Sequence, residues 1–205
     1  MIVLVTDPRY EIDHVVRTIE QVGAVLPREA FVVQLRDKSS SPDIRDRLAE
    51  RIRRTGVRFV LNGTPEEALR VGADGVHLPG ASPDLAHARV VLGDDAWVSI
   101  AAHDDDAVTF AVEGRATAAL VSPIFETPGK GAPRGVSALA RAKAIAKGRV
   151  RIIALGGIDS RRAASCAEAG ADGIAVIRAI FESSEPGTAA LELTRELTGQ
   201  FTDRP

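Results

Sequence analysis

Short apolar runs alternate along this chain with longer segments that are rich in charged residues. The runs are dominated by Val, Ile, Leu and Ala, which is the pattern of parallel strands buried on both faces. We expect eight strands, at residues 2–6, 30–35, 59–62, 75–78, 97–101, 118–121, 151–155 and 173–177. The segments between the runs carry helical spacing, so the chain predicts strands and helices in alternation.

The segment after the second run shows the helical spacing clearly. Ile44, Leu48 and Ile52 lie four residues apart, which places them on one face of a helix. Ser41 and Pro42 precede this pattern and are residue types that favour helix starts. Alternating strands and helices of this kind predict parallel strands joined by right-handed crossovers.

Eight strand–helix units predict an α/β fold, a single (β/α)₈ TIM barrel. We expect one domain over residues 1–205, since no linker or low-complexity stretch interrupts the alternation. An open doubly wound sheet is the rival architecture. The count of eight and the lack of an early Gly-x-Gly-x-x-Gly motif favour the barrel.

The composition narrows the classes of partner. The 205 residues are 45% hydrophobic, and the formal net charge of −2 provides no overall basic field for nucleic acid. Aromatic residues make up only 4%, which disfavours a stacking surface for single strands. No apolar run reaches the roughly 18 residues of a membrane helix, and the single cysteine, Cys166, suits a reducing compartment. We expect a cytoplasmic protein with small-molecule partners, no nucleic acid and no membrane; a homodimer remains open.

Two glycines follow the seventh predicted strand, and an arginine follows the eighth. Loops after these strands of a barrel often bind phosphate, because glycine lets backbone N–H groups approach the oxygens. We expect Gly156 and Gly157 to contact a phosphate and Arg178 to add a second contact. A tight turn and a solvated arginine are the alternatives. Lys130, in the glycine-rich loop 121–135, could close over a phosphate as a mobile charge.

Gln34, Arg36 and Lys38 alternate along the end of the second predicted strand. Period-two spacing points the three side chains to the same side. Two cations and an amide at the mouth of a barrel suit a polyanionic or heteroaromatic ligand. A surface run of charge is the alternative interpretation.

Two of the four histidines, His77 and His103, lie close to predicted strand ends. Either could face the mouth of the barrel and act there as a general acid or base. No two histidines have metal-ligand spacing. The acidic residues 104–106 are expected to start a helix, where they favour the dipole, rather than to bind metal. We therefore predict no metal ligands among these residues.

Together these segments resemble the thiamine-phosphate synthase/TenI superfamily, from residue 4 to about residue 186. The resemblance is carried by Val-Gln-Leu-Arg-Asp-Lys at 33–38, Asn-Gly at 62–63, Ala-Asp-Gly-Val-His-Leu at 73–78, Pro-Ile-Phe-Glu-Thr at 123–127, Lys130, Arg-Gly-Val-Ser at 134–137, Ala-Leu-Gly-Gly-Ile at 154–158 and Gly-Ala-Asp-Gly-Ile-Ala-Val at 170–176. It implies a (β/α)₈ barrel that handles thiamine precursors.

The synthase branch joins hydroxymethylpyrimidine diphosphate to thiazole phosphate, and magnesium assists the departure of diphosphate. The resemblance implies that Gln34, Arg36, Lys38 and Asn62 hold the pyrimidine diphosphate and that Lys130 contacts the leaving diphosphate. Further substrate contacts are expected from the resemblance and from the loop motifs. They are Thr127, Gly135, Gly156, Gly157, Ala175, Val176 and Arg178.

Several positions depart from the family pattern. Gly63 stands where the synthase has a magnesium aspartate, and Ser82 falls near its second metal carboxylate. We therefore expect no cofactor, and Mg²⁺ only if the protein is a transferase. The TenI branch includes a thiazole tautomerase, whose acid/base histidine falls at Pro123 here. His103 could replace that base, which makes His103 and Lys130 the candidate catalytic residues.

Three functions stay open on these grounds. We favour a TenI-like protein that binds phosphorylated thiazole and acts as a tautomerase, an isomerase. The second is a thiamine-phosphate synthase, a transferase with relocated metal ligands, because the residues expected to hold the pyrimidine diphosphate are retained. The third is a non-catalytic binding or regulatory barrel, because both known mechanisms lack groups in this chain.

Overall fold

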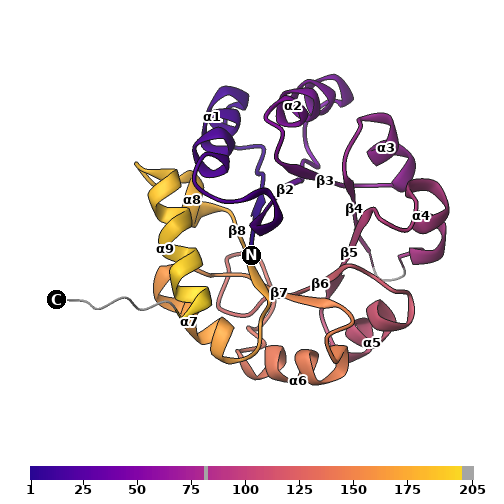
Figure 1. Cartoon of the computed structure of the whole chain (residues 1–205), viewed down its shortest axis with the longest axis vertical. Coiled ribbons are helices and arrows are strands. Elements are labelled where there is room, and N and C mark those ends of the chain that lie inside the picture. The colour runs from indigo at the N-terminus through magenta and orange to yellow at the C-terminus, as the bar shows by residue number, and fades with distance from the viewer. Residues whose placement is uncertain (81–82, 200–205) are drawn as a thin grey trace.

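Eight parallel strands close into a barrel in the order β1 to β8 in this computed structural model, which describes residues 1–80 and 83–199 (Figure 1). The strands are β1 Ile2–Val5, β2 Phe31–Leu35, β3 Arg58–Asn62, β4 Gly75–Leu78, β5 Trp97–Ala102, β6 Ala118–Val121, β7 Arg151–Leu155 and β8 Gly173–Val176. Each predicted strand agrees with an observed strand to within one residue at either end. The predicted (β/α)₈ barrel is therefore confirmed.

Helices form a ring around the strands and cover the outer face of the barrel (Figure 1). They are α1 Ile12–Gly23, α2 Pro42–Arg54, α3 Pro65–Arg70, α4 Leu85–Leu92, α5 Asp105–Glu113, α6 Ser137–Ala146, α7 Ser160–Glu168, α8 Arg178–Phe181 and α9 Pro186–Thr198, with a 3₁₀ turn, η1 Arg28–Ala30, before β2. The acidic run at 104–106 starts a helix as predicted, because the Asp104 side chain caps α5. Within the described residues, no helix is long and apolar enough to cross a membrane.

Alternation along each strand divides the core into two parts. In β1, Ile2 and Leu4 pack against the helices, whereas Val3 and Val5 belong to the cluster inside the barrel. Trp97 lies in that inner cluster, with the guanidinium groups of Arg58 and Arg151 5.9 and 5.8 Å from its ring centroid. Inward side chains near the amino ends of the strands thus fill the barrel.

Two aspartates align strands at the amino-terminal end of the barrel. The Asp74 carboxylate accepts a hydrogen bond of 2.8 Å from the Phe59 N–H, and Asp172 accepts one of 2.9 Å from the Ile152 N–H. Each aspartate also donates its own N–H to the carbonyl of the same partner, at 2.7 and 2.8 Å. Each Asp-Gly entry into a strand thereby locks the neighbouring strand in register.

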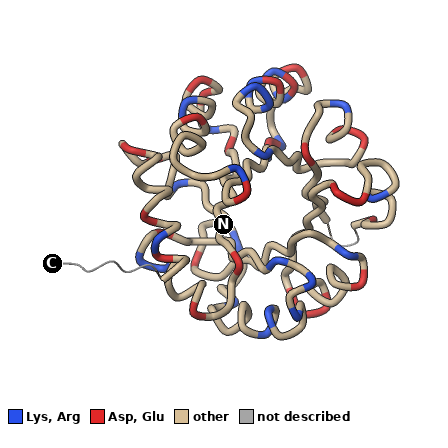
Figure 2. The backbone as a smooth tube through the Cα atoms, in the orientation of Figure 1, with Lys and Arg blue, Asp and Glu red and all other residues tan. Residues whose placement is uncertain are grey.

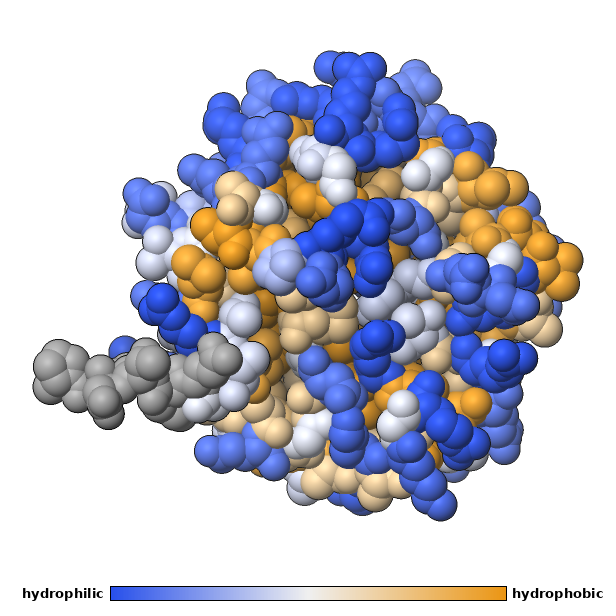
Figure 3. Space-filling view, viewed as in Figure 1, coloured by the Kyte–Doolittle hydropathy of each residue, from blue (hydrophilic) through white to orange (hydrophobic). Residues whose placement is uncertain are grey.

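Charges of both signs are spread over the outer helices (Figure 2). Hydrophilic and apolar groups are mixed on the face shown in Figure 3, and one apolar group lies on its right, over α3 and α4. Leu69 and Val90 are 60% and 83% exposed on these two helices. The outer surface thus carries both signs of charge and no single strong field.

Candidate functional site

A cavity of about 550 Å³ opens at the carboxyl ends of the strands. Twelve of the thirteen predicted site residues line it: Gln34, Arg36, Lys38, Asn62, His103, Thr127, Lys130, Gly156, Gly157, Ala175, Val176 and Arg178. Gly135 is not among the lining residues; its N–H donates to the carbonyl of Ile124 at 3.0 Å and closes the base of a loop. The fold thus gathers at one mouth residues that lie up to 144 positions apart.

Uncharged polar side chains from three consecutive strands, Gln34, Asn62 and His77, line one side of the cavity, and Ser99 on β5 contacts the last of them. Asn62 donates through Nδ2 to Gln34 Oε1 at 3.4 Å, and it is the register partner of His77 on β4. His77 is in turn the register partner of Ser99, whose Oγ lies 3.1 Å from His77 Nδ1. Gln34, His77 and Ser99 are all buried. This row, which we call the polar floor, offers hydrogen bonds without charge.

His77 stays neutral at physiological pH. Burial lowers the pKa of its imidazole to about 4, and the neighbouring Arg36, His103 and Lys38 act in the same direction. The sequence placed His77 near the mouth without indicating its charge state. A neutral ring in this position serves the polar floor as a hydrogen-bonding group.

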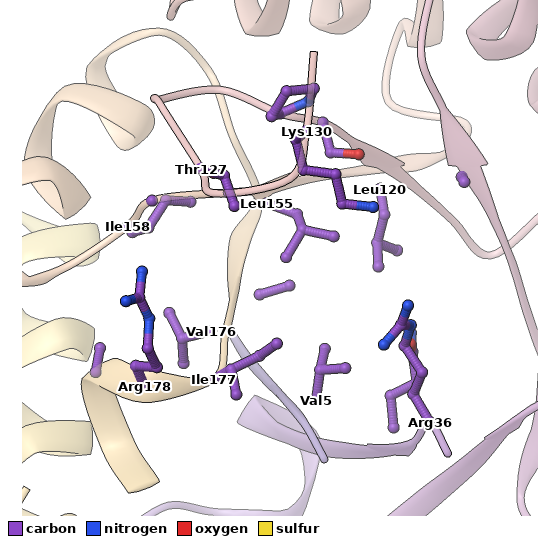
Figure 4. Close-up of a pocket in the computed structure, with 18 of the residues that line it drawn as sticks. Val5, Arg36, Leu120, Thr127, Lys130, Leu155, Ile158, Val176, Ile177 and Arg178 are labelled. Atoms are coloured by element: carbon purple, nitrogen blue, oxygen red, sulfur yellow. The ribbon is translucent and has the colours of Figure 1, made fainter. Parts of the chain in front are cut away.

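The four cations that the sequence predicted at the cavity have no ion-pair partner among the described residues. Arg36 and Lys38 extend from the end of β2, Lys130 from the loop after β6, and Arg178 from the start of α8. None of them forms a salt bridge within residues 1–80 and 83–199. Figure 4 shows Arg36 and Arg178 on opposite sides, with Lys130 reaching toward the cavity and Val5, Leu120 and Leu155 between them. Unpaired cations around an apolar centre favour an anionic ligand with an uncharged body.

Gly156 and Gly157 occupy positions that other residues would strain. Their φ angles are +110° and +64°. A Cβ on Gly156 would lie 3.0 Å from Pro123 Cα, and one on Gly157 would lie 2.6 Å from the Glu126 carbonyl oxygen. The loop after β6 therefore packs directly on this turn. Both glycines line the cavity, as a phosphate cradle requires, and they also permit this loop contact.

Sequence reasoning missed Arg162, a lining residue from α7. Its Nη1 donates to the Gly157 carbonyl at 2.5 Å, and its guanidinium lies 5.0 Å from the Phe125 ring centroid. Arg162 thus joins the glycine turn to the β6 loop and adds positive charge beside the turn. It lies in the first turn of a helix, where an arginine carries no local signal of a site, and only its contacts with the glycine turn and the β6 loop reveal it.

His103 follows β5 and lies at the exposed rim of the cavity. Its Nδ1 is 3.1 Å from the Ser122 carbonyl oxygen and 3.4 Å from the Ser122 hydroxyl. Because a carbonyl oxygen only accepts, this contact places the hydrogen on Nδ1 and leaves the lone pair on Nε2. His103 is thereby arranged to accept a proton at Nε2.

The residues at the end of β3 do not fit a magnesium site. Mg²⁺ requires oxygen ligands, and no group of three His, Cys, Asp or Glu side chains suited to a metal occurs among the described residues. A Cβ on Gly63 would lie 2.7 Å from Glu67 Oε2, a carboxylate that caps α3. Ser82, the second family position, lies outside the described residues. The described carboxylates that line the cavity, Glu126, Asp159 and Glu182, come from the opposite side, after β6, β7 and β8.

Known proteins resemble this chain over almost its full length. The family profile TMP-TENI, described as thiamine monophosphate synthase, matches residues 2–180. Thiamine-phosphate synthase of Halorhodospira halophila is 34% identical over 201 residues, covering 94% of this chain and 91% of that protein. Thiamine-phosphate synthase of Mycobacterium tuberculosis is 31% identical over 211 residues, covering 95% and 93%. The structure of thiamine phosphate pyrophosphorylase from Pyrococcus furiosus aligns with a TM-score of 0.75 at 22% identity, covering 97% of this chain and 95% of that one.

Proposed function

Because the chain belongs to the thiamine monophosphate synthase (TMP-TENI) family, we propose that it binds a phosphorylated thiazole in this cavity and isomerises it by proton transfer, as a TenI-like tautomerase. The observation that supports the proposal is the position of His103 at a cavity in which the residues at the end of β3 do not fit a magnesium site. A proton shift of this kind needs a base, and it needs no neutralisation of a departing diphosphate.

The phosphate of such a ligand fits the side of the cavity that holds Gly156, Gly157 and Arg178. Glycine there lets a phosphate oxygen approach backbone N–H groups, and the Arg178 guanidinium supplies paired donors. The thiazole ring then extends over the apolar centre, where Leu120 and Leu155 offer contact without competing hydrogen bonds. The ring edge is directed toward the polar floor and the His103 rim.

Two histidines line the cavity, and His103 is the better base. His77, with a pKa of about 4, has little affinity for a proton at neutral pH. His103 lies at the exposed rim with its Nε2 lone pair available. In the proposed reaction, His103 takes a proton from one position of the ring system and a proton is returned at another. No atom is gained or lost, and the product is the aromatic thiazole carboxylate phosphate.

The test is turnover of the unaromatised thiazole carboxylate phosphate, followed by the appearance of the aromatic ring in proton NMR. His103→Gln should slow the reaction about a hundredfold or more, the usual contribution of a general base. His87→Gln is the matched control, since His87 is exposed on α4 and does not line the cavity. Equal rates for wild type and His103→Gln would remove His103 as the base.

A synthase reaction is the second candidate, favoured by a separate observation. Gln34, Asn62 and three of the unpaired cations, Arg36, Lys38 and Lys130, line the same cavity. Their charges could neutralise a departing diphosphate in place of the carboxylate-bound metal of the family. The relatives at 31% and 34% identity are thiamine-phosphate synthases by name.

A coupling assay separates the two candidates. Pyrimidine diphosphate and aromatic thiazole phosphate are incubated with the protein, with magnesium or with EDTA, and thiamine phosphate is measured by fluorescence after oxidation. Product above the no-enzyme control establishes a transferase. Thiazole phosphate binding without turnover in either assay would instead identify a binding barrel.

A further inference from the structure

Two walls of the cavity come from different elements and meet at Arg134. One wall is the β6 loop, residues 122–136, which carries Thr127 and Lys130; the other is the segment after β5, which carries His103. Arg134 Nη1 donates to the Ala102 carbonyl at 3.3 Å, and Nη2 donates to Asp105 Oδ1 at 3.1 Å. Its side chain is only 15% exposed, yet it does not line the cavity.

Asp105 extends the connection to α6. Its second oxygen, Oδ2, accepts a hydrogen bond of 2.9 Å from Arg141 Nε. Ala102, the other acceptor of Arg134, directly precedes His103, and His103 is itself held by the Ser122 carbonyl at the start of the β6 loop. Arg134 therefore fastens the end of the loop to the same segment that its beginning touches.

Beyond its packing on the Gly156–Gly157 turn, the β6 loop is fixed by hydrogen bonds at its two ends. Its own hydrogen bonds are local: Thr127 Oγ1 donates to the Phe125 carbonyl at 3.0 Å, and the Lys130 N–H donates to the Thr127 carbonyl at 3.1 Å. The amino end of the loop is fixed by the Ile124 N–H, which donates to the Leu155 carbonyl at 2.9 Å. The carboxyl end of the loop is fixed by Arg134. Its N–H donates to the Pro123 carbonyl at 2.8 Å, and its side chain extends from the loop to the segment after β5.

We propose that Arg134 is a positioning residue that holds the Lys130 loop and the His103 segment in one arrangement across the cavity. It acts through these two side chains and touches no ligand itself. Arginine suits this role because its planar guanidinium reaches a carbonyl and a carboxylate at the same time, which a lysine ammonium does less well. The consequence is that the Lys130 ammonium and the His103 imidazole keep a constant relation across the cavity.

Arg134→Gln tests the proposal, with Arg141→Gln as the matched control. Both arginines donate to Asp105, but Arg141 is 52% exposed and belongs to α6 rather than to the loop. Trypsin cleavage after Lys130 reports on the loop and does not depend on the proposed function. Loss of charge-assisted hydrogen bonds should raise the rate of that cleavage about tenfold in Arg134→Gln, while Arg141→Gln stays within about twofold.

A second measurement separates positioning from general weakening. Inorganic pyrophosphate should slow cleavage after Lys130 in the wild type, and this protection should be lost in Arg134→Gln but kept in Arg141→Gln. Asp105→Asn, which preserves the shape of the acceptor, should show an intermediate effect, and circular dichroism checks that each variant is folded. Equal cleavage and equal protection in the two arginine variants would overturn the proposal.

The positioning role and the proposed function fail separately. The role in proton transfer rests on the proposed function, and there Arg134→Gln should lower kcat as well as raise KM, with partial rescue by Arg134→Lys. If the wild type does not turn over the thiazole carboxylate phosphate, the tautomerase is wrong, while the trypsin results still decide whether Arg134 holds the loop.

Discussion

Acidification should destabilise this protein through one buried histidine. Burial, together with nearby positive charge, lowers the pKa of His77 to about 4 in the folded chain, from 6.5 in the unfolded chain. As the pH falls below 6.5, the unfolded chain binds a proton at this position that the folded chain does not bind. The free energy of unfolding should therefore decrease from about pH 6.5 and level off below about pH 4.

The size of this effect follows from the difference between the two pKa values. At 1.36 kcal/mol per pKa unit, a fall from 6.5 to about 4 corresponds to about 3 kcal/mol in total. About 2 kcal/mol of this should be lost between pH 7.5 and pH 5, since the unfolded side chain titrates in that interval.

Urea unfolding of the wild type and of His77→Asn at both pH values measures this difference. Asparagine cannot titrate, and its amide lies near the position of Nδ1, so a hydrogen bond to Ser99 is retained. The wild type should lose about 2 kcal/mol more than the variant on acidification, because other groups titrate equally in both proteins. Equal losses, within about 0.5 kcal/mol, would show that His77 does not resist protonation and would refute the burial argument.

Three further predictions concern the cavity. Gly156→Ala, at φ +110° and 3.0 Å from Pro123 Cα, should cost about 1–3 kcal/mol in urea unfolding and weaken thiazole phosphate binding in calorimetry, whereas Gly131→Ala, which meets nothing within 4 Å, should do neither. Lys130→Ala should weaken inorganic pyrophosphate binding about tenfold without moving the thermal midpoint, because the side chain is exposed; unchanged affinity would remove Lys130 from the anion site. The double variant Gly63→Asp, Ser82→Asp should raise magnesium-dependent coupling, and no gain would mean that more than the metal site differs.

The barrel could be predicted because its strands are buried on both faces. Runs such as 118–121 and 173–176 carry no polar residue and are buried throughout. Only their ordered alternation with helices was needed to infer parallel strands. The spacing of two between Gln34, Arg36 and Lys38 predicted that their side chains point to the same side, and all three line the cavity. The alternation follows from extended backbone geometry, which continues beyond the end of β2.

Contacts between separate loops could not be predicted in the same way. Arg162 and Arg134 have no local pattern that sets them apart from other surface arginines. Their roles depend on where the loop after β6 lies relative to α7 and α5. Gly135 shows the converse case, because its motif suggested a ligand contact, whereas its N–H closes the loop base.

The aspartates at the amino-terminal end have a consequence for how this protein can change through evolution. Asp74 and Asp172 set the strand alignment from the end opposite the cavity, by bonds that involve no mouth residue. A slip of one residue would turn every inward side chain outward, and these bonds resist it. A change of residue at the carboxyl end of a strand, such as Gly63 after β3, therefore leaves the alignment of the barrel untouched. Because strand alignment and chemistry depend on opposite ends of the barrel, the reaction can change during evolution while the scaffold is kept.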